Sequence, residues 1–123
     1  MADHNDLGNL AEEMAAEFLK DLGYKILSRN YRFQKAEIDI IALFNKEIII
    51  VEVKARSTDV FLEPQEAVTK RKIKLVVMAA NEYMKAGNRT ENVRFDIISV
   101  LPDDNGVLKI THLPDAFEAF DAN

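Results

Sequence analysis

Residues 37–54 read EIDIIALFNKEIIIVEVK, and this stretch decides the fold. Two runs of Ile, Leu, Val and Phe meet at Asn45–Lys46, and charged residues stand at the far end of each run. Runs this apolar are typical of central strands that are buried on both faces of a sheet. The stretch therefore predicts a β-hairpin, with strands at 37–44 and 47–55, in the interior of an α/β domain.

The rest of the chain predicts the helices that would cover this sheet. The remaining predicted elements are a helix at 7–22 capped by Gly23, a strand at 24–33, a helix at roughly 65–86 introduced by Pro64, strands at 92–100 and 107–113, and a tail at 114–123 that is either a short helix or frayed. The predicted fold class is α/β, with a mixed five-stranded sheet flanked by helices in the order α-β-β-β-α-β-β. Strand 47–55, the second helix and the next strand would form a right-handed parallel crossover.

Composition narrows the class of protein. The 123 residues, 48% hydrophobic and 30% charged, predict one globular domain over 1–123. Because cysteine is absent, disulfides and thiolate metal sites are excluded. The sequence shows neither a signal peptide nor an apolar run long enough to cross a membrane, so we expect a cytoplasmic protein without membrane contact.

Charge is distributed unevenly along the chain. The net charge is −5, yet residues 20–90 carry +5 and the two ends together carry −10. A locally basic surface can neutralise phosphates even when the whole chain is acidic. Charge alone leaves two interpretations open, a phosphate-binding surface and ordinary solvated faces. The basic residues of the middle segment include Arg29, Arg32, Lys35, Lys54, Arg56, Lys70, Arg71, Lys72 and Lys74.

The hairpin predicts which charged residues meet. A turn symmetric about Asn45–Lys46 pairs residues whose numbers sum to 91, so Asp39 lies opposite Glu52. Since side chains alternate along a strand, Glu52 and Lys54 share one face with Asp39. A one-residue bulge would instead place the two acids on opposite faces.

Two opposed carboxylates in apolar surroundings repel each other unless one is protonated or a cation lies between them. Mg²⁺ is a fitting cation, because it takes one or two carboxylates and keeps waters for a phosphate. A lysine on the same patch suits metal-assisted phosphodiester hydrolysis. The alternative is a ladder of salt bridges at the solvated end of the sheet, made by Glu37, Asp39, Glu52 and Lys54.

The spacing D-x12-ExK at Asp39, Glu52 and Lys54 resembles the PD-(D/E)xK nuclease signature, and nearly the whole chain resembles the YraN-like family of small bacterial proteins, related to archaeal Holliday-junction resolvases. Six segments in order carry the resemblance: the helical stretch from Gly8 to Leu19, SRNYR at 28–32, AEIDIIA at 36–42, VEVKARS at 51–57, EPQEAVTKRK at 63–72 and RFD at 94–96.

This resemblance implies a restriction-endonuclease-like fold and a metal-dependent DNA endonuclease. It implies that Asp39 and Glu52 bind Mg²⁺ or Mn²⁺, with the Val53 carbonyl as a third ligand. Lys54 would position or activate the attacking water, and Glu12 matches the helix glutamate near the metal site of resolvase relatives. Branched DNA is the implied substrate by analogy, and a pair of active sites would require a homodimer.

Two departures and several further residues complete the prediction. Ala11 and Ala36 replace glycines of the family pattern, which puts the fine geometry of the site in question. Lys72 stands on an apolar helical stripe, so it either extends to an edge or reaches a polar site beneath the helix. The residues expected to hold the DNA backbone are Arg29, Arg32, Arg56, Lys70, Lys72 and Lys74.

Other polar residues receive structural interpretations. Glu37 is expected to orient Lys54, Asp96 to be a buried structural carboxylate, and His112 to have no function. Two other classes of function remain open beside the nuclease. One is a non-catalytic module that binds nucleic acid or a protein on the same fold, and the other is a structural protein whose acidic ends engage a basic partner.

Overall fold

The computed structural model describes residues 4–56 and 69–122. Its elements follow the predicted order of one helix, three strands, a second helix and two strands. They are α1 (His4–Asp21), β1 (Lys25–Phe33), β2 (Ala36–Phe44), β3 (Glu47–Ala55), α2 (Lys70–Ala86), β4 (Asn92–Pro102), β5 (Leu108–Phe117) and a short 3₁₀ helix (Ala119–Ala122). Within this part of the chain, no helix is long and apolar enough to cross a membrane.

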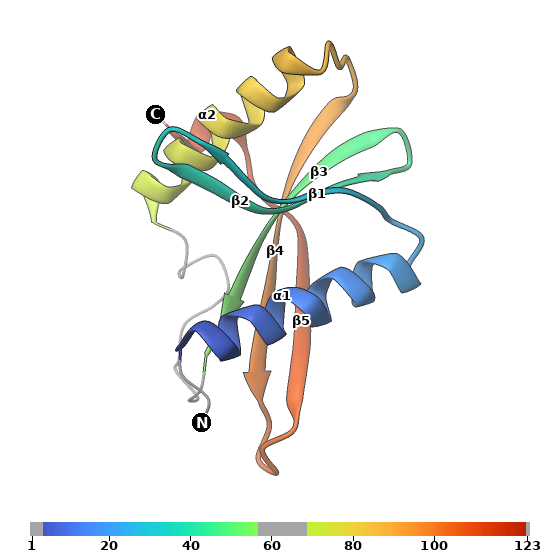
Figure 1. Ribbon diagram of the computed structural model, residues 1–123, viewed down its shortest axis with the longest axis vertical. Coiled ribbons are helices and arrows are strands. Elements are labelled where there is room, and N and C mark those ends of the chain that lie inside the picture. Colours follow the sequence, from blue (N-terminus) through green and yellow to red (C-terminus); the bar gives the residue numbers. More distant parts are fainter. Residues whose placement is uncertain (1–3, 57–68, 123) are drawn as a thin grey trace.

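The five strands form one mixed sheet in the order β1-β2-β3-β4-β5 (Figure 1). Neighbouring strands are antiparallel except for β3 and β4, which run parallel and are joined through α2. The predicted mixed sheet and parallel crossover are therefore confirmed. This topology makes β3 the central strand, so the residues at its end lie in the interior of the sheet.

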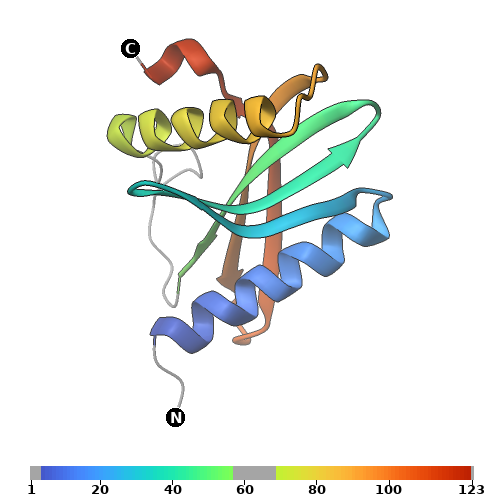
Figure 2. The ribbon, with the colours of Figure 1, turned by 45° about the horizontal axis from the view of Figure 1, so that its top comes forward.

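The two long helices lie on opposite sides of the sheet, with α2 above it and α1 below it in Figure 2. Ile48 and Ile50 of β3 belong to the core beneath α2. Ile49 and Val51 of the same strand belong to the core beneath α1. Because both faces of β3 are covered, its middle residues 48–51 are all apolar, as the hairpin predicted.

The hairpin has the predicted register. Phe44 pairs with Glu47, and the regular ladder continues to Ile40 and Val51, with residue numbers summing to 91 throughout. Both turn residues have positive φ, +50° at Asn45 and +66° at Lys46, which is the two-residue turn whose twist matches a β-hairpin. Counted away from the turn, the last residue of β2 in this ladder is Ile40, so Asp39 lies just beyond the ladder.

Element ends differ from prediction, most of all at the start of the second helix and at the end of the last strand. The second helix starts at Lys70, because the Thr69 side chain accepts a hydrogen bond from the Lys72 N–H and caps it. The prediction of a continuous helix from residue 65 is therefore wrong, and Pro64 lies outside the described residues. Strand β5 continues to Phe117, whose ring stacks on Phe95, and the tail then forms the 3₁₀ helix.

Gly23 ends α1 as predicted. Its φ is +95°, and its N–H donates to the Lys20 carbonyl while the Tyr24 N–H donates to the Leu19 carbonyl. These two bonds satisfy carbonyls at the end of the helix and turn the chain into β1.

Candidate metal centre

Asp39 lies where β2 stops pairing with β3. Its Oδ2 accepts a hydrogen bond from the Val53 N–H at 2.8 Å. The side chain of Asp39 thus bonds to the β3 backbone just past the last ladder pair, and this bond holds the carboxylate beside Glu52. The Val53 N–H fixes Asp39, whereas metal ligation by the Val53 carbonyl stays a prediction.

Glu52 is a buried acid on the central strand. Only 1% of the residue is exposed, and one of its oxygens, Oε1, is buried without a hydrogen-bond partner among the described residues. Burial, together with the negative charge of Asp39, raises the pKa of Glu52 to about 7. The two carboxylates are therefore electrostatic neighbours in a site that does not satisfy them fully.

Two lysines oppose this repulsion from different elements. Lys72 of α2 brings its Nζ to 3.5 Å from Glu52 Oε2, so the apolar stripe of α2 does place a lysine over a polar site. Burial raises the pKa of Asp39, while the Val53 N–H and the charges of Lys72 and Lys54 lower it. Lys54 forms no ion pair among the described residues, so its ammonium group is not held by a carboxylate there.

Glu12 approaches the same site from α1. Burial raises the pKa of Glu12, and the charge of Asp39 is the next cause. Arg29 and a hydrogen bond with the Asn30 side chain act in the opposite direction. Glu12 is therefore on the α1 side of Asp39, whereas Lys72 comes from α2, and the site lies between the two helices at the end of the hairpin.

The alanines that replace the family glycines fit the fold. Ala11 is fully buried in α1, and Ala36 is 2% exposed at the start of β2. Neither residue has a positive φ, so neither position needs the backbone freedom of glycine. The two departures from the family pattern leave the backbone of the site unstrained.

The oxygen atoms of the site fit a magnesium ion better than zinc. Within residues 4–56 and 69–122, no group of three His, Cys, Asp or Glu side chains is close enough to hold a metal by itself. Zinc sites use three or four such ligands, but Mg²⁺ binds through one or two carboxylates and keeps several waters. The orphaned Oε1 of Glu52 beside Asp39 meets that smaller requirement.

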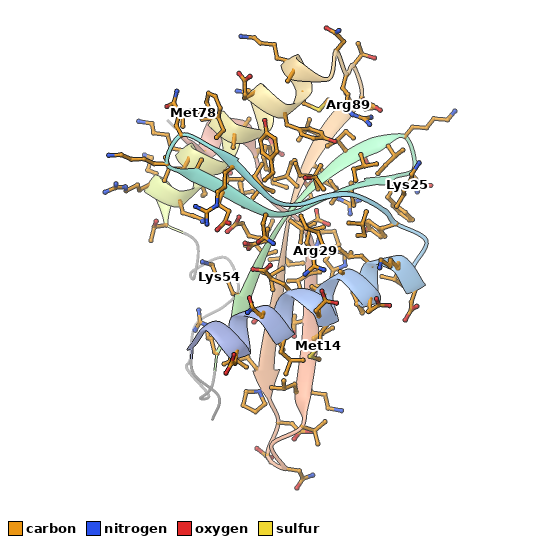
Figure 3. All side chains as sticks on the ribbon, viewed as in Figure 1. Met14, Lys25, Arg29, Lys54, Met78 and Arg89 are labelled. Atoms are coloured by element: carbon orange, nitrogen blue, oxygen red, sulfur yellow. The ribbon has the colours of Figure 1, made fainter. Side chains whose placement is uncertain are left out.

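The predicted DNA-binding residues do not form one cluster. Arg29 pairs with Glu13 of α1, and Figure 3 shows Arg29 close to that helix, with Lys54 on β3. Arg32 pairs with Glu37 at 3.3 Å, directly across β1 and β2. The ion pair of Glu37 is thus with Arg32, and the interpretation that Glu37 orients Lys54 is wrong.

The first turn of α2 gathers positive charge instead. Lys70 and Arg71 are exposed, Lys72 is half-buried, and the turn contains no acidic residue. Lys74 is exposed one turn further along, and Arg56 is partly exposed after β3. Cations at the start of a helix are disfavoured by the helix dipole, so this arrangement needs a compensating anion.

A second buried carboxylate lies on β4. Asp96 is fully buried, as predicted for a structural residue. It accepts bonds from Arg94 Nε at 2.9 Å and Nη2 at 2.8 Å, and from the Asp115 N–H at 3.0 Å, while His112 Nε2 lies 2.8 Å from its Oδ2. Sequence reasoning missed His112, because its contact crosses from β5 to β4 beside an irregularity in pairing between Phe95 and Ile97.

Residues 11–100 match the model of a family described as "Uncharacterised protein family UPF0102". The chain belongs to UPF0102. The matched segment contains Glu12, Asp39, Glu52, Lys54 and Lys72, so every side chain of the candidate centre lies within the family region. The predicted YraN-like resemblance is confirmed at the level of the family.

Similar UPF0102 proteins match along their whole length. A protein from Christiangramia forsetii is 47% identical over 120 residues, covering 98% of this chain and all of the relative. One from Flavobacterium psychrophilum is 48% identical with the same coverage. One from Bacteroides thetaiotaomicron is 46% identical over 117 residues, covering 95% of this chain and 96% of the relative.

Proposed function

We propose that this UPF0102 protein is a metal-dependent DNA endonuclease that hydrolyses phosphodiester bonds, with Mg²⁺ or Mn²⁺ held by Asp39 and Glu52. The observation that carries the proposal is the buried Glu52, whose Oε1 has no partner among the described residues while Asp39 lies beside it. A pair of buried acids that is only partly compensated destabilises a fold, and a divalent cation would offset that cost.

The side chains of the site would have different roles in such a reaction. Asp39 and Glu52 would hold the Mg²⁺, which would supply polarisation of a scissile phosphate and a lowered pKa for a water. Asp39 is held in place by the Val53 N–H, so it is oriented before any ligand arrives. Lys54 adds a positive charge beside both acids and is free of any ion pair in the described ranges, which suits it to hold the attacking water or a phosphate oxygen.

DNA would be held by the basic first turn of α2. Lys70 and Arg71 are exposed at the positive end of the helix dipole, where a phosphate would compensate both the dipole and the side-chain charges. Arg29, Arg32, Arg56 and Lys74 would contribute to the same electrostatic attraction from other elements. A branched substrate and a homodimer follow from the likeness to resolvases.

The test is cleavage of plasmid and four-way-junction DNA with and without Mg²⁺ or Mn²⁺. We expect metal-dependent cleavage that Asp39→Asn, Glu52→Gln and Lys54→Met each abolish. Asp104→Asn is the matched control, because Asp104 is an exposed acid in the β4–β5 turn, and it should cleave like the wild type. If neither Mg²⁺ nor Mn²⁺ supports cleavage, the proposed endonuclease activity is refuted.

A non-catalytic nucleic-acid-binding module on the same fold is the second candidate. The basic first turn of α2 favours it, since phosphate binding there does not depend on the carboxylates. This candidate predicts salt-sensitive junction binding that Lys70→Ala and Arg71→Ala weaken, with no cut in any metal. The endonuclease predicts the same binding together with cleavage.

A further inference from the structure

Lys72 occupies an unusual position for a helix lysine. Its Nζ lies 3.5 Å from Glu52 Oε2, and its side chain is one-third exposed (33%), whereas the Glu52 side chain is 1% exposed. It follows the stripe of α2 that buries Val76 and Ala79 against the sheet. The ammonium group therefore lies at the border between solvent and the site.

The placement of Lys72 is explained by the acids beneath it. A cation in the first turn of a helix is disfavoured by the helix dipole, and desolvating an ammonium group adds to that cost. Lys70 and Lys74 on the same helix remain exposed. The charge of Lys72 lowers the pKa of both Asp39 and Glu52, so it partly neutralises the pair from above.

We propose that Lys72 is a built-in counter-cation of the Asp39–Glu52 pair, which a divalent ion displaces when it binds. The inference rests on the proposed function, because it takes the two carboxylates as the ligands. An ion bound to Glu52 would bring two positive charges close to the ammonium group, and like charges at such a distance repel strongly. Lys72 and the metal therefore compete for the same carboxylate.

The geometry allows the lysine to leave. Its 3.5 Å contact is longer than a normal hydrogen bond of about 2.7–3.2 Å, so little directional bonding is lost on release. Lysine has a long flexible side chain, and one third of this one is already exposed to solvent. Once displaced, the ammonium group joins Lys70 and Arg71 at the start of α2, where an incoming phosphate is attracted.

Two measurements test the displacement on the full chain. Calorimetric titration with Mg²⁺ at about pH 8.5, where protons compete little with the metal, compares the wild type with Lys72→Met and with the control Lys85→Met. We expect Lys72→Met to bind Mg²⁺ roughly tenfold more tightly than the wild type, because a repelling charge is removed. Lys85→Met should bind like the wild type, since Lys85 is exposed in the last turn of the same helix.

The second measurement follows the wild-type lysine directly. Amine acylation read by mass spectrometry should label Lys72 faster when Mg²⁺ is saturating and leave the labelling of Lys85 unchanged. If the wild type binds Mg²⁺ but Lys72→Met binds equally or less tightly, or if Mg²⁺ leaves Lys72 labelling unchanged, the displacement is refuted while the metal centre stands. If no variant binds Mg²⁺, the metal centre and the displacement both fail.

Discussion

The protein buries acids in two regions that differ in how their charge is compensated. Asp96 on β4 accepts hydrogen bonds from two nitrogens of the Arg94 guanidinium and from the Asp115 N–H, and the ring of His112 contacts it as well. Glu52 on the neighbouring strand has a single long contact with Lys72 and one oxygen without a partner among the described residues. The two side chains are equally inaccessible to water, yet only one is satisfied.

The pKa values of the two acids move in opposite directions for this reason. Burial alone would raise the pKa of Asp96, but the bonds from Arg94, His112 and Asp115 outweigh it and hold the pKa below its ordinary value. Burial raises the pKa of Glu52 to about 7, because its partners are too weak to oppose desolvation. A satisfied buried acid stabilises the fold, whereas an unsatisfied one marks a candidate binding site.

The largest effect is expected at the satisfied acid. Asp96→Ala leaves the Arg94 guanidinium, whose side chain is 18% exposed, without its nearest carboxylate. Removing one member of a buried ion pair costs about 3–5 kcal/mol of unfolding free energy. Urea denaturation at neutral pH measures the loss, with exposed Asp104→Ala as the control. A loss as small as that of the control would show that the network contributes little.

Removing the charge of the unsatisfied acid is expected to increase the unfolding free energy, not to decrease it. The rise of the Glu52 pKa from its ordinary 4.5 to about 7 corresponds to about 3 kcal/mol of destabilisation when the group is ionised. Glu52→Gln should therefore increase the unfolding free energy at about pH 8 without metal, by up to that amount. A decrease in the same urea experiment would mean that Glu52 is compensated as well as Asp96 is.

The two acids should also differ in how their contribution to stability changes with pH. The folded pKa of Glu52 is raised, so its contribution to stability is complete below about pH 4.5 and is lost as the pH rises through about 7. The folded pKa of Asp96 is lowered, so its contribution is lost only as the pH falls below the ordinary value of 3.8. As the pH rises from about 4.5 to 8, the urea midpoint of the metal-free wild type should fall, and that of Glu52→Gln should change less. Identical profiles would contradict the raised pKa.

The smallest effect is expected at an ion pair exposed to solvent. Arg32 pairs with Glu37, and its side chain is 77% exposed, so Arg32→Ala should change the unfolding free energy by less than about 1 kcal/mol. The same change should weaken DNA binding and reduce its dependence on salt, which fluorescence anisotropy measures. A large loss of stability would place Arg32 with the buried network rather than on the surface.

The fold and the register of the central hairpin followed from local patterns. The apolar runs on either side of Asn45–Lys46 predicted the hairpin, and the symmetry of the turn predicted its register. The apolar stripe of α2 predicted that Lys72 could reach a polar site. These features depend on residues close in sequence, where alternation and helical spacing are decisive.

Contacts made by the outer strands were not predictable in the same way. The Glu37 partner is Arg32, which lies directly opposite it across β1 and β2, a pairing that the hairpin of β2 and β3 does not indicate. The contact of His112 with Asp96 depends on an irregular pairing of β4 with β5. A single sequence does not determine such shifts in register. A shift of one residue moves every side chain that follows to the other face of the sheet.

The central claim is that Asp39 and Glu52 share one divalent ion, and Mn²⁺ binding followed by electron paramagnetic resonance tests it most directly. The account predicts one Mn²⁺ per wild-type chain, with binding lost in both Asp39→Asn and Glu52→Gln and retained in Asp104→Asn. Failure of the wild type to bind Mn²⁺, or binding that persists in both substituted proteins, would contradict it.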